Sequence, residues 1–246
     1  MSYLIIGASS GLGRELSIKF AQENNNLIIV SRDLRDLNAL KSDLELRFKV
    51  KVECLAIDFS SLNEINEKLL TNKEILKNIK GVLFPIGLMF ENDNFETKEE
   101  NVQKLIVANF LSISFTINKL SNYLENNSTI VGFGSVSGLL GRNLNSNYAA
   151  AKRALESFFE SLAFEKKFKN SKIQFYTLGY LDTNLAFGKK LVLPKGSTKK
   201  LAHIVFKNKK SDFKKTFFPK YWGIISFALK IIPFSILVKL YKILTK

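Results

Sequence analysis

Short apolar runs alternate with helical patterns along the first three quarters of the chain. The apolar runs occupy residues 3–6, 27–30, 52–58, 81–87, 128–135 and 172–180, and helical patterns occupy residues 14–22, 33–47, 62–77, 98–123 and 148–167. Mostly apolar strands that alternate with helices are typical of a parallel sheet covered on both faces. We therefore expect a doubly wound α/β fold. No repeat or linker marks a boundary before about residue 188.

The charge of the chain is unevenly distributed. Nearly all of the net charge of +15 lies in residues 189–246, which contain 15 lysines and one acid, Asp212. We expect residues 1–188 to form the core and residues 189–246 to form a basic, apolar extension that serves as a substrate lid and as a membrane or oligomer contact. Nucleic acid is the weaker candidate partner, because the basic region has almost no arginine and no recognisable binding motif.

The last stretch, residues 216–246, is apolar but interrupted by lysines and by Pro233. Its longest uncharged run, residues 221–229, has nine residues. A membrane-spanning helix needs ~20 apolar residues, and proline splits helices. We expect two short helices in residues 217–246. They either lie on a membrane surface, with the preceding lysines attracted to anionic lipid, or pack on the core or in an oligomer.

Composition narrows the class of protein. Apolar residues make up 46% and charged residues 24% of the chain, as in globular proteins. A single cysteine, Cys54, excludes an internal disulfide framework, and with His203 as the only histidine a Cys/His metal site is implausible. The N-terminus has neither a basic start nor a cleavage site, so we expect no signal peptide and a cytoplasmic protein, peripheral at the inner membrane face if the tail binds lipid.

The segment GASSGLG, residues 7–13, lies between the first apolar run and the first helical pattern. Glycines allow a tight turn there, and the following helix N-terminus offers N–H groups and a positive dipole end to a pyrophosphate. Ser9 and Ser10 add hydroxyl donors. This turn predicts a dinucleotide site in a Rossmann-type fold.

The end of the second apolar run indicates which dinucleotide binds. NAD-binding proteins usually place a carboxylate there, whereas this run ends in Ser31 and Arg32. A hydroxyl and a guanidinium suit a 2′-phosphate, and Arg14 adds a second candidate cation. Asp33 follows and argues the other way. We expect NADP(H) as the cofactor.

The segment NYAAAK, residues 147–152, places Tyr148 and Lys152 on one face of a helix. Three alanines between them leave that face uncrowded. An ammonium close to a phenol favours the phenolate and brings the tyrosine, whose ordinary pKa is ~10, toward working pH. The spacing alone is common by chance, so other residues must support an acid–base role.

Several motifs in order resemble the short-chain dehydrogenase/reductase family over residues 3–188. The similar positions are GASSGLG (7–13), Asp58, Asn109 in VANF, Ser135, the Tyr148–Lys152 pair, Gly179 and Thr183. Two positions depart from the family pattern, since Ile6 replaces a threonine and Leu178 replaces a proline.

The resemblance implies a reductase or dehydrogenase in which Tyr148 donates the proton. Lys152 lowers the pKa of that phenol and binds the nicotinamide ribose, and Ser135 holds the carbonyl oxygen. Asn109 holds a water for proton resupply, and Thr183 binds the carboxamide. The implied cofactor contacts are Gly7, Ser9, Ser10, Gly11, Leu12, Gly13, Arg14, Ser31, Arg32, Asp58, Phe59, Pro85, Gly87, Tyr148, Lys152, Gly179 and Thr183. The family also implies a homo-oligomer, dimer or tetramer.

The loop after the fourth run reads FPIG, residues 84–87, where the family often has NNAG. Together with the apolar, basic tail, this segment looks like a narrower branch, the reductases of decaprenylphosphoryl-2-keto-ribose. That resemblance implies NADPH-dependent reduction of a keto-sugar on a polyprenyl phosphate or another glycan precursor. The alternatives are a reductase of a soluble carbonyl or 3-oxoacyl substrate and a non-catalytic NADP-binding scaffold.

Overall fold

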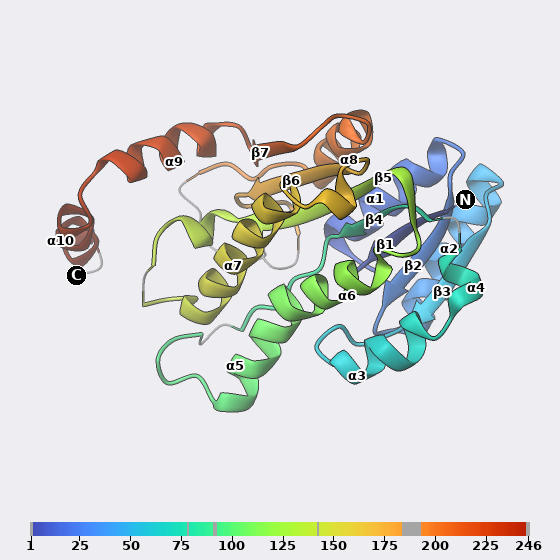
Figure 1. Cartoon of the computed structure of the whole chain (residues 1–246). Coiled ribbons are helices and arrows are strands. Elements are labelled where there is room, and N and C mark those ends of the chain that lie inside the picture. The colour runs from blue at the N-terminus through green and yellow to red at the C-terminus, as the bar shows by residue number, and fades with distance from the viewer. Residues whose placement is uncertain (1, 78, 91–92, 142, 184–192, 245–246) are drawn as a thin grey trace.

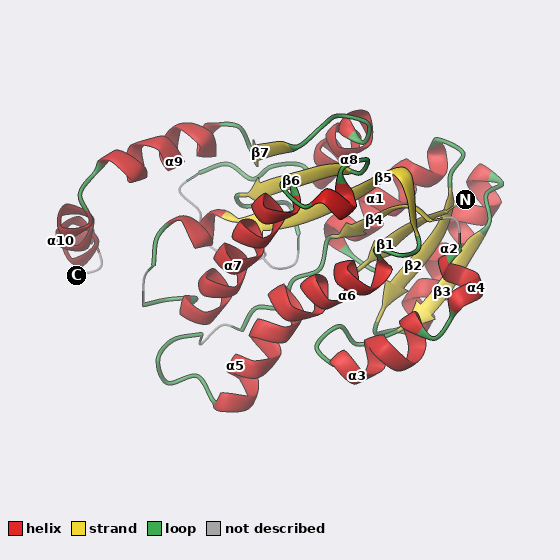
Figure 2. Ribbon diagram, in the orientation of Figure 1, coloured by secondary structure: helices red, strands yellow, loops and turns green. Residues whose placement is uncertain are grey.

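Seven parallel strands form one sheet in the order β3-β2-β1-β4-β5-β6-β7 (Figure 2). The computed structural model describes residues 2–77, 79–90, 93–141, 143–183 and 193–244. The strands are β1 (Ser2–Ile6), β2 (Asn26–Ser31), β3 (Val52–Ala56), β4 (Ile79–Phe84), β5 (Leu124–Ser135), β6 (Lys172–Leu178) and β7 (Lys214–Phe218). The strand order reverses between β1 and β4, and ligands of such sheets bind at the strand carboxyl ends beside this point. The expected doubly wound α/β fold is confirmed.

Helices cover both faces of the sheet (Figure 1). One face carries α1 (Gly11–Gln22), α2 (Leu34–Phe48) and α8 (Thr198–Asn208), and the other carries η1 (Ile65–Leu70), α4 (Lys73–Leu76), α6 (Ser112–Leu120) and α7 (Ser146–Leu162). Shorter elements are α3 (Leu62–Glu64), α5 (Glu99–Ile106), η2 (Val107–Leu111), η3 (Val136–Leu139) and η4 (Lys166–Phe168).

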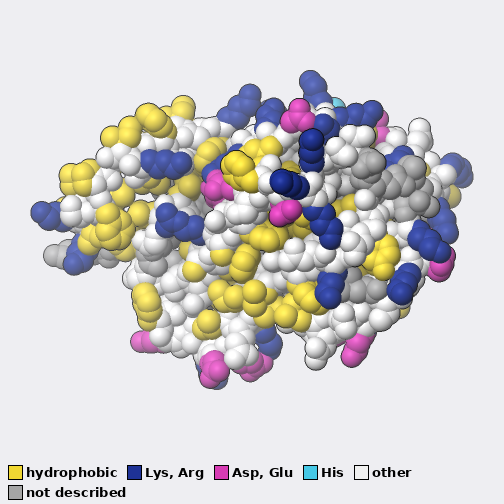
Figure 3. All heavy atoms as spheres, in the orientation of Figure 1, with side chains coloured by type: hydrophobic (Ala, Val, Ile, Leu, Met, Phe, Trp, Pro, Cys, Tyr) yellow, Lys and Arg dark blue, Asp and Glu magenta, His cyan; other side chains and the backbone are white. Residues whose placement is uncertain are grey.

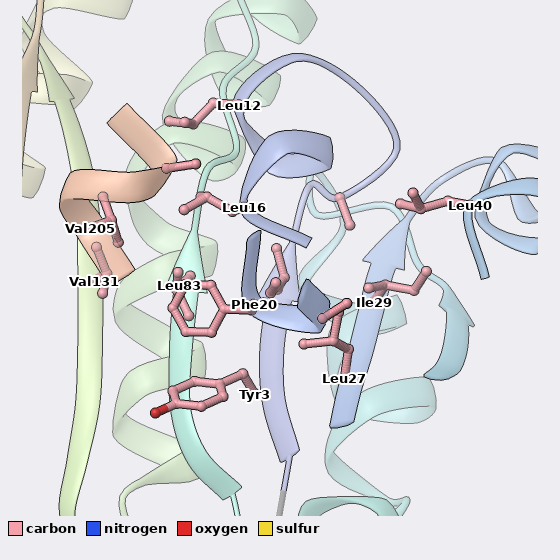
Figure 4. Close-up of a cluster of buried hydrophobic side chains, with 14 of the residues drawn as sticks. Tyr3, Leu12, Leu16, Phe20, Leu27, Ile29, Leu40, Leu83, Val131 and Val205 are labelled. Atoms are coloured by element: carbon pink, nitrogen blue, oxygen red, sulfur yellow. The ribbon is translucent and has the colours of Figure 1, made fainter. Parts of the chain in front are cut away.

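The apolar run of β1 shows why its residues form a central strand. Neighbouring side chains of a strand point to opposite faces. Tyr3 and Ile5 therefore enter the core beneath α1, while Leu4 and Ile6 enter the core beneath η1, α4 and α6. In Figure 4 the ring of Phe20 from α1 lies near Tyr3, and their centroids are 4.6 Å apart in an edge-to-face contact. Burial of one such side chain stabilises the fold by about 1.5–3 kcal/mol.

The structure corrects several predicted elements. The predicted helix over 62–77 is divided into α3, η1 and α4, and the helix expected over 98–123 is α5, η2 and α6, with a π-helical turn at its centre. The helix expected over 148–167 begins at Ser146 and ends at Leu162. Two elements were not predicted at all: α8 packs against α1, and β7 pairs with β6. Much of the basic region after residue 188 thus belongs to the sheet and its helical layer.

The chain ends in α9 (Tyr221–Ile231) and α10 (Phe234–Leu244), separated at Pro233. The two short helices expected in this region are therefore confirmed. They extend away from the sheet at the end opposite β3 (Figure 1). None of the described helices is by itself long and apolar enough to span a membrane. Helices α9 and α10 together have that length and composition, but they are bent by 114° at the break between them.

Candidate active site

A cavity of about 940 Å³ opens at the carboxyl ends of the central strands. Nearly all of the predicted site residues line it: Gly7, Ser9, Ser10, Gly11, Leu12, Ser31, Arg32, Asp58, Phe59, Pro85, Gly87, Ser135, Tyr148, Lys152, Gly179 and Thr183. Three predicted residues, Gly13, Arg14 and Asn109, are not among the described lining residues. The structure thus brings together positions separated by more than 170 residues of sequence.

The glycine turn has the geometry that a pyrophosphate requires. Gly7 and Gly11 have φ angles of +96° and +49°, in the region that favours glycine. Ser10 is the N-cap of α1, yet within the described chain its side chain makes no capping hydrogen bond. The first turn of α1 contains no acidic residue. Backbone N–H groups and the Ser10 hydroxyl are therefore available to an anion at a positive helix end.

Gly13 and Arg14 have positions different from those expected. A Cβ on Gly13 would lie 1.9 Å from the carbonyl oxygen of Gly7, so this glycine allows α1 to pack against the turn itself. Arg14 is exposed on α1, outside the described lining of the cavity. The part of Arg14 in cofactor binding stays a prediction.

Arg32 lies at the cavity beside the end of β2. Its neighbour Asp33 caps α2, accepting hydrogen bonds from the backbone N–H groups of Arg35 at 2.8 Å and Asp36 at 3.3 Å. No ion pair engages the Arg32 guanidinium within the described part of the chain. Asp33, the acid that argued against a phosphate site, thus caps the N-terminus of α2. The Arg32 side chain is therefore available to a ligand.

Lys152 is nearly completely buried on α7, with 3% of its surface exposed. Its Nζ donates hydrogen bonds to the carbonyl oxygens of Ile86 and Phe133, each at 3.1 Å, and lies 5.9 Å from the centroid of the Tyr148 ring. Burial lowers the pKa of Lys152 to about 8. The two carbonyls hold the ammonium at the floor of the cavity.

Burial raises the pKa of Tyr148 above its ordinary value, while a hydrogen bond with the Ser135 side chain lowers it. Burial is the larger effect. We expected from the sequence that Lys152 lowers this pKa; its Nζ donates to two carbonyls and lies 5.9 Å from the centroid of the Tyr148 ring, and its effect on the Tyr148 pKa stays a prediction. At neutral pH Tyr148 is thus a protonated phenol, the form required of a proton donor.

The FPIG segment is tied to the active site in a way that the sequence did not indicate. The Asn109 amide, which is fully buried in η2, donates to the carbonyl oxygen of Leu88 at 2.8 Å and accepts from its N–H at 3.2 Å. A Cβ on Gly87 would lie 3.6 Å from Asn109 Oδ1 and 3.9 Å from Lys152 Nζ. Contacts to Ile86 and Leu88 thus fasten this loop without the asparagines of NNAG. The water-holding role of Asn109 stays a prediction.

The other side of the cavity involves Thr183 and Gly179. A Cβ on Gly11 would lie 3.1 Å from Thr183 Cγ2, so Thr183 sits against the glycine turn. A Cβ on Gly179 would lie 1.9 Å from Nε1 of Trp222, so this glycine admits the first turn of α9. Trp222 is a neighbour of the site that sequence reasoning missed, because only its contact with Gly179 reveals it.

Comparison with known proteins agrees with this geometry. A family model described as short chain dehydrogenase matches residues 2–190. The chain belongs to the short chain dehydrogenase family. As a short chain dehydrogenase it is an oxidoreductase, and the family resemblance seen in the sequence is confirmed.

The curated relatives of this short chain dehydrogenase are named for activities other than the keto-ribose reduction expected from the sequence. It is 30% identical to hydroxysteroid 11-beta-dehydrogenase 1-like protein B of Xenopus laevis, covering 92% of this chain and 80% of that protein. It is 28% identical to very-long-chain 3-oxoacyl-CoA reductase of Vanderwaltozyma polyspora, covering 74% of this chain and 55% of that protein. Neither name indicates a keto-ribose reductase.

Solved structures share the fold of this short chain dehydrogenase. The bulky-bulky ketone specific alcohol dehydrogenase from Comamonas testosteroni has a TM-score of 0.78 at 21% identity, covering 94% of both chains. A short-chain dehydrogenase from Sphingobium yanoikuyae in complex with NADPH has a TM-score of 0.74 at 22% identity, covering 94% of this chain and 96% of that one.

Proposed function

We propose that this protein is an NADPH-dependent reductase of a carbonyl group carried on a lipid-like substrate. The observation that carries the proposal is geometric: Tyr148, Ser135 and Lys152 line one cavity together with a dinucleotide-binding turn. A ketone that gains a hydride also needs a proton at its oxygen, and a phenol in the cavity can donate that proton.

The cofactor is NADP(H), which supplies the hydride when bound. The turn at residues 7–13 would hold the pyrophosphate, and Arg32 with Ser31 would hold the 2′-phosphate. Lys152 would reach the nicotinamide ribose. The fit rests on the uncapped start of α1 and on the guanidinium left available by Asp33.

The side chains divide the remaining work of the reaction. Tyr148 donates its phenolic proton to the carbonyl oxygen. The Ser135 hydroxyl donates a hydrogen bond to the same oxygen and stabilises its developing negative charge. Lys152, held by Ile86 and Phe133, stabilises the phenolate that remains. Asn109 keeps the Leu88 backbone, and with it the cavity wall, in position.

We predict that Arg32→Ala raises the KM for NADPH by about 10- to 100-fold, the effect of losing a charge-assisted hydrogen bond. The KM for NADH should change little, since NADH has no 2′-phosphate. Steady-state kinetics with both cofactors measure this ratio. Arg35→Ala is the matched control, because Arg35 is exposed and pairs with Asp33 and Asp36. Equal losses with both cofactors would contradict the assignment.

The cavity wall favours an apolar carbonyl substrate. Beside the catalytic side chains, the described lining contributes Leu88, Met89, Leu144 and Tyr180, against the polar Ser137 and Asn145. The relatives named for hydroxysteroid and very-long-chain 3-oxoacyl-CoA chemistry support a ketone on an apolar body. A 3-oxoacyl chain or a steroid-like ketone is thus the first candidate substrate.

A keto-sugar on a polyprenyl phosphate, the substrate expected from the sequence, is the second candidate. The observation in its favour is the lysine-rich, apolar tail, which suits an anionic lipid. NADPH oxidation assays separate the two candidates. Turnover of long-chain 3-oxoacyl thioesters or steroid ketones would favour the first, and turnover confined to a chemically oxidised lipid-linked sugar fraction would favour the second. Turnover of short, water-soluble ketones alone would contradict a lipid-like substrate.

Helices α9 and α10 are the proposed membrane contact. They expose a set of large apolar side chains: Ile224, Phe227, Ile231, Phe234, Ile236, Leu240 and Ile243. Figure 3 shows apolar side chains gathered at this end of the molecule with lysines beside them. Apolar residues interspersed with lysines suit an anionic lipid surface. We place the protein in the cytoplasm, at the inner face of the membrane, and as a homo-oligomer of the kind expected for the family.

We predict that Ile224→Glu combined with Phe227→Glu lowers binding to anionic vesicles by at least about tenfold, because two apolar contacts are replaced by like charges. Co-sedimentation with vesicles of phosphatidylglycerol and phosphatidylcholine measures the binding. Phe164→Glu is the control, since Phe164 is 89% exposed at another place on the surface. Unchanged sedimentation together with a smaller oligomer on gel filtration would instead assign the helices to subunit packing.

A further inference from the structure

The catalytic helix α7 begins without a cap of its own. Its N-cap residue, Asn145, has a φ angle of +57° and makes no side-chain capping hydrogen bond within the described chain. The first turn of α7 contains no acidic residue. The N–H groups at the start of a helix lack partners inside the helix, so they need acceptors from elsewhere.

Asp93, from the segment between β4 and α5, supplies these acceptors. Its Oδ1 accepts from the backbone N–H of Asn147 at 3.1 Å and from the Asn147 side-chain amide at 2.7 Å. Its Oδ2 accepts from the backbone N–H of Tyr148 at 2.8 Å. Its carbonyl oxygen also accepts from Ser146 N at 3.3 Å. A residue more than 50 positions away in the sequence thus caps the catalytic helix at the proton donor itself.

This contact is buried, with 1% of Asp93 exposed. A buried carboxylate is costly unless hydrogen bonds and a favourable field compensate it. Three N–H donors and the positive end of α7 provide both. Such an arrangement is rigid, because any displacement of the helix start would leave a buried carboxylate without partners.

Residues 85–89, which precede Asp93, line the same cavity as Tyr148. The carbonyl oxygen of Ile86 accepts a hydrogen bond from Lys152 Nζ, and the carbonyl oxygen of Leu88 accepts one from the Asn109 side-chain amide. Further along the chain, the Asp93 carboxylate accepts a hydrogen bond from the backbone N–H of Tyr148. Hydrogen bonds from Ile86 and Asp93 therefore tie this part of the chain to both members of the catalytic pair, Lys152 and Tyr148.

We propose that Asp93 is a positioning residue for Tyr148, a role that rests on the proposed reductase function. It touches no reacting atom and acts through the backbone of the proton donor. The cofactor-binding turn and Arg32 lie on other elements, so loss of Asp93 should affect the proton-transfer geometry far more than the binding of NADPH.

Asp93→Ala is the direct test. Misplacement of a reacting group by about 1 Å costs up to about 100-fold in rate, so kcat per NADPH-binding site should fall by about 10- to 100-fold. The KM for the ketone and the Kd for NADPH should stay close to those of the unchanged protein. Asp93→Asn keeps one acceptor oxygen and should give an intermediate kcat. If Asp93→Ala does not fold, Asp93→Asn serves as the test variant in its place.

Counting active sites by NADPH fluorescence titration separates positioning from a loss of folded protein. Asn72→Ala is the control, since Asn72 caps α4 through Ile75 N, outside the described lining of the cavity. It should lower stability without lowering kcat per site. Unchanged kcat per site in Asp93→Ala and Asp93→Asn would overturn the proposal, as would losses explained by fewer NADPH sites.

Hydrogen exchange distinguishes this proposal from the proposed function. The amides of Asn147 and Tyr148 should exchange faster in Asp93→Ala, whether or not a substrate is known. If the protein without substitutions reduces no ketone, that result contradicts the proposed reductase function. Unchanged exchange at these amides would overturn the positioning role by itself.

Discussion

Tyr148→Phe is expected to lower kcat for carbonyl reduction by about 10²- to 10⁴-fold, the range of a lost general acid. The ring remains, so the packing of α7 is preserved, but the proton that the carbonyl oxygen needs is absent. Burial raises the pKa of this phenol above its ordinary value, and a hydrogen bond joins it to the Ser135 side chain. Among the described lining residues of the cavity, Tyr148 is the only tyrosine on the catalytic helix α7.

The measurement is the single-turnover rate of NADPH oxidation with saturating ketone. NADPH affinity should be little changed in the variant, which shows that the site is intact. Tyr123→Phe is a matched control, because Tyr123 packs against the core beneath α7 and is not among the described lining residues of the cavity. A variant that retains more than about a tenth of the rate would mean that another group supplies the proton.

Gly13→Ala is expected to lower the free energy of unfolding by about 3 kcal/mol, the upper part of the range for overpacking a tight contact. The added Cβ would lie 1.9 Å from the Gly7 carbonyl oxygen, and a backbone atom cannot move aside as a flexible side chain can. Displacement of the glycine turn should also weaken NADPH binding. The effect on stability therefore comes together with an effect on the cofactor.

Urea unfolding and NADPH titration measure the two effects. Gly141→Ala is the control, because an added Cβ at Gly141 meets no atom within 4 Å. A Gly13→Ala protein as stable as Gly141→Ala would contradict the close packing of α1 against the turn.

The catalytic residues could be predicted because their spacing follows from secondary structure. A helix brings positions four apart to one face, and strand ends of a parallel sheet meet at one edge. Tyr148, Lys152 and Ser135 therefore meet at the cavity as expected. The close packing of Gly13 against the turn could not be predicted, because the cofactor motif does not distinguish a residue that faces the ligand from one that packs against the turn.

Long-range contacts explain the other differences. The lysines of α8 indicated a basic surface, yet Leu201, Ala202 and Val205 form a buried stripe against α1 at helical spacing. That stripe was a usable signal. Asp93 gave no such signal, since nothing local distinguishes an acid that caps a distant helix from a surface carboxylate. The same holds for Trp222, whose place over Gly179 depends on how α9 leaves β7.

The central claim is that this chain moves a hydride from NADPH to a carbonyl carbon while Tyr148 supplies the proton. The most direct test uses NADPH deuterated at the nicotinamide C4 with long-chain 3-oxoacyl thioesters, steroid ketones and an oxidised lipid extract, followed by mass spectrometry of the products. We predict an alcohol with one deuterium on the carbinol carbon, formed by the unchanged protein and formed about 10²- to 10⁴-fold more slowly by Tyr148→Phe. Bound NADPH with no labelled alcohol from any of these substrates, or labelling in Tyr148→Phe at more than about a tenth of the rate of the unchanged protein, would contradict the account.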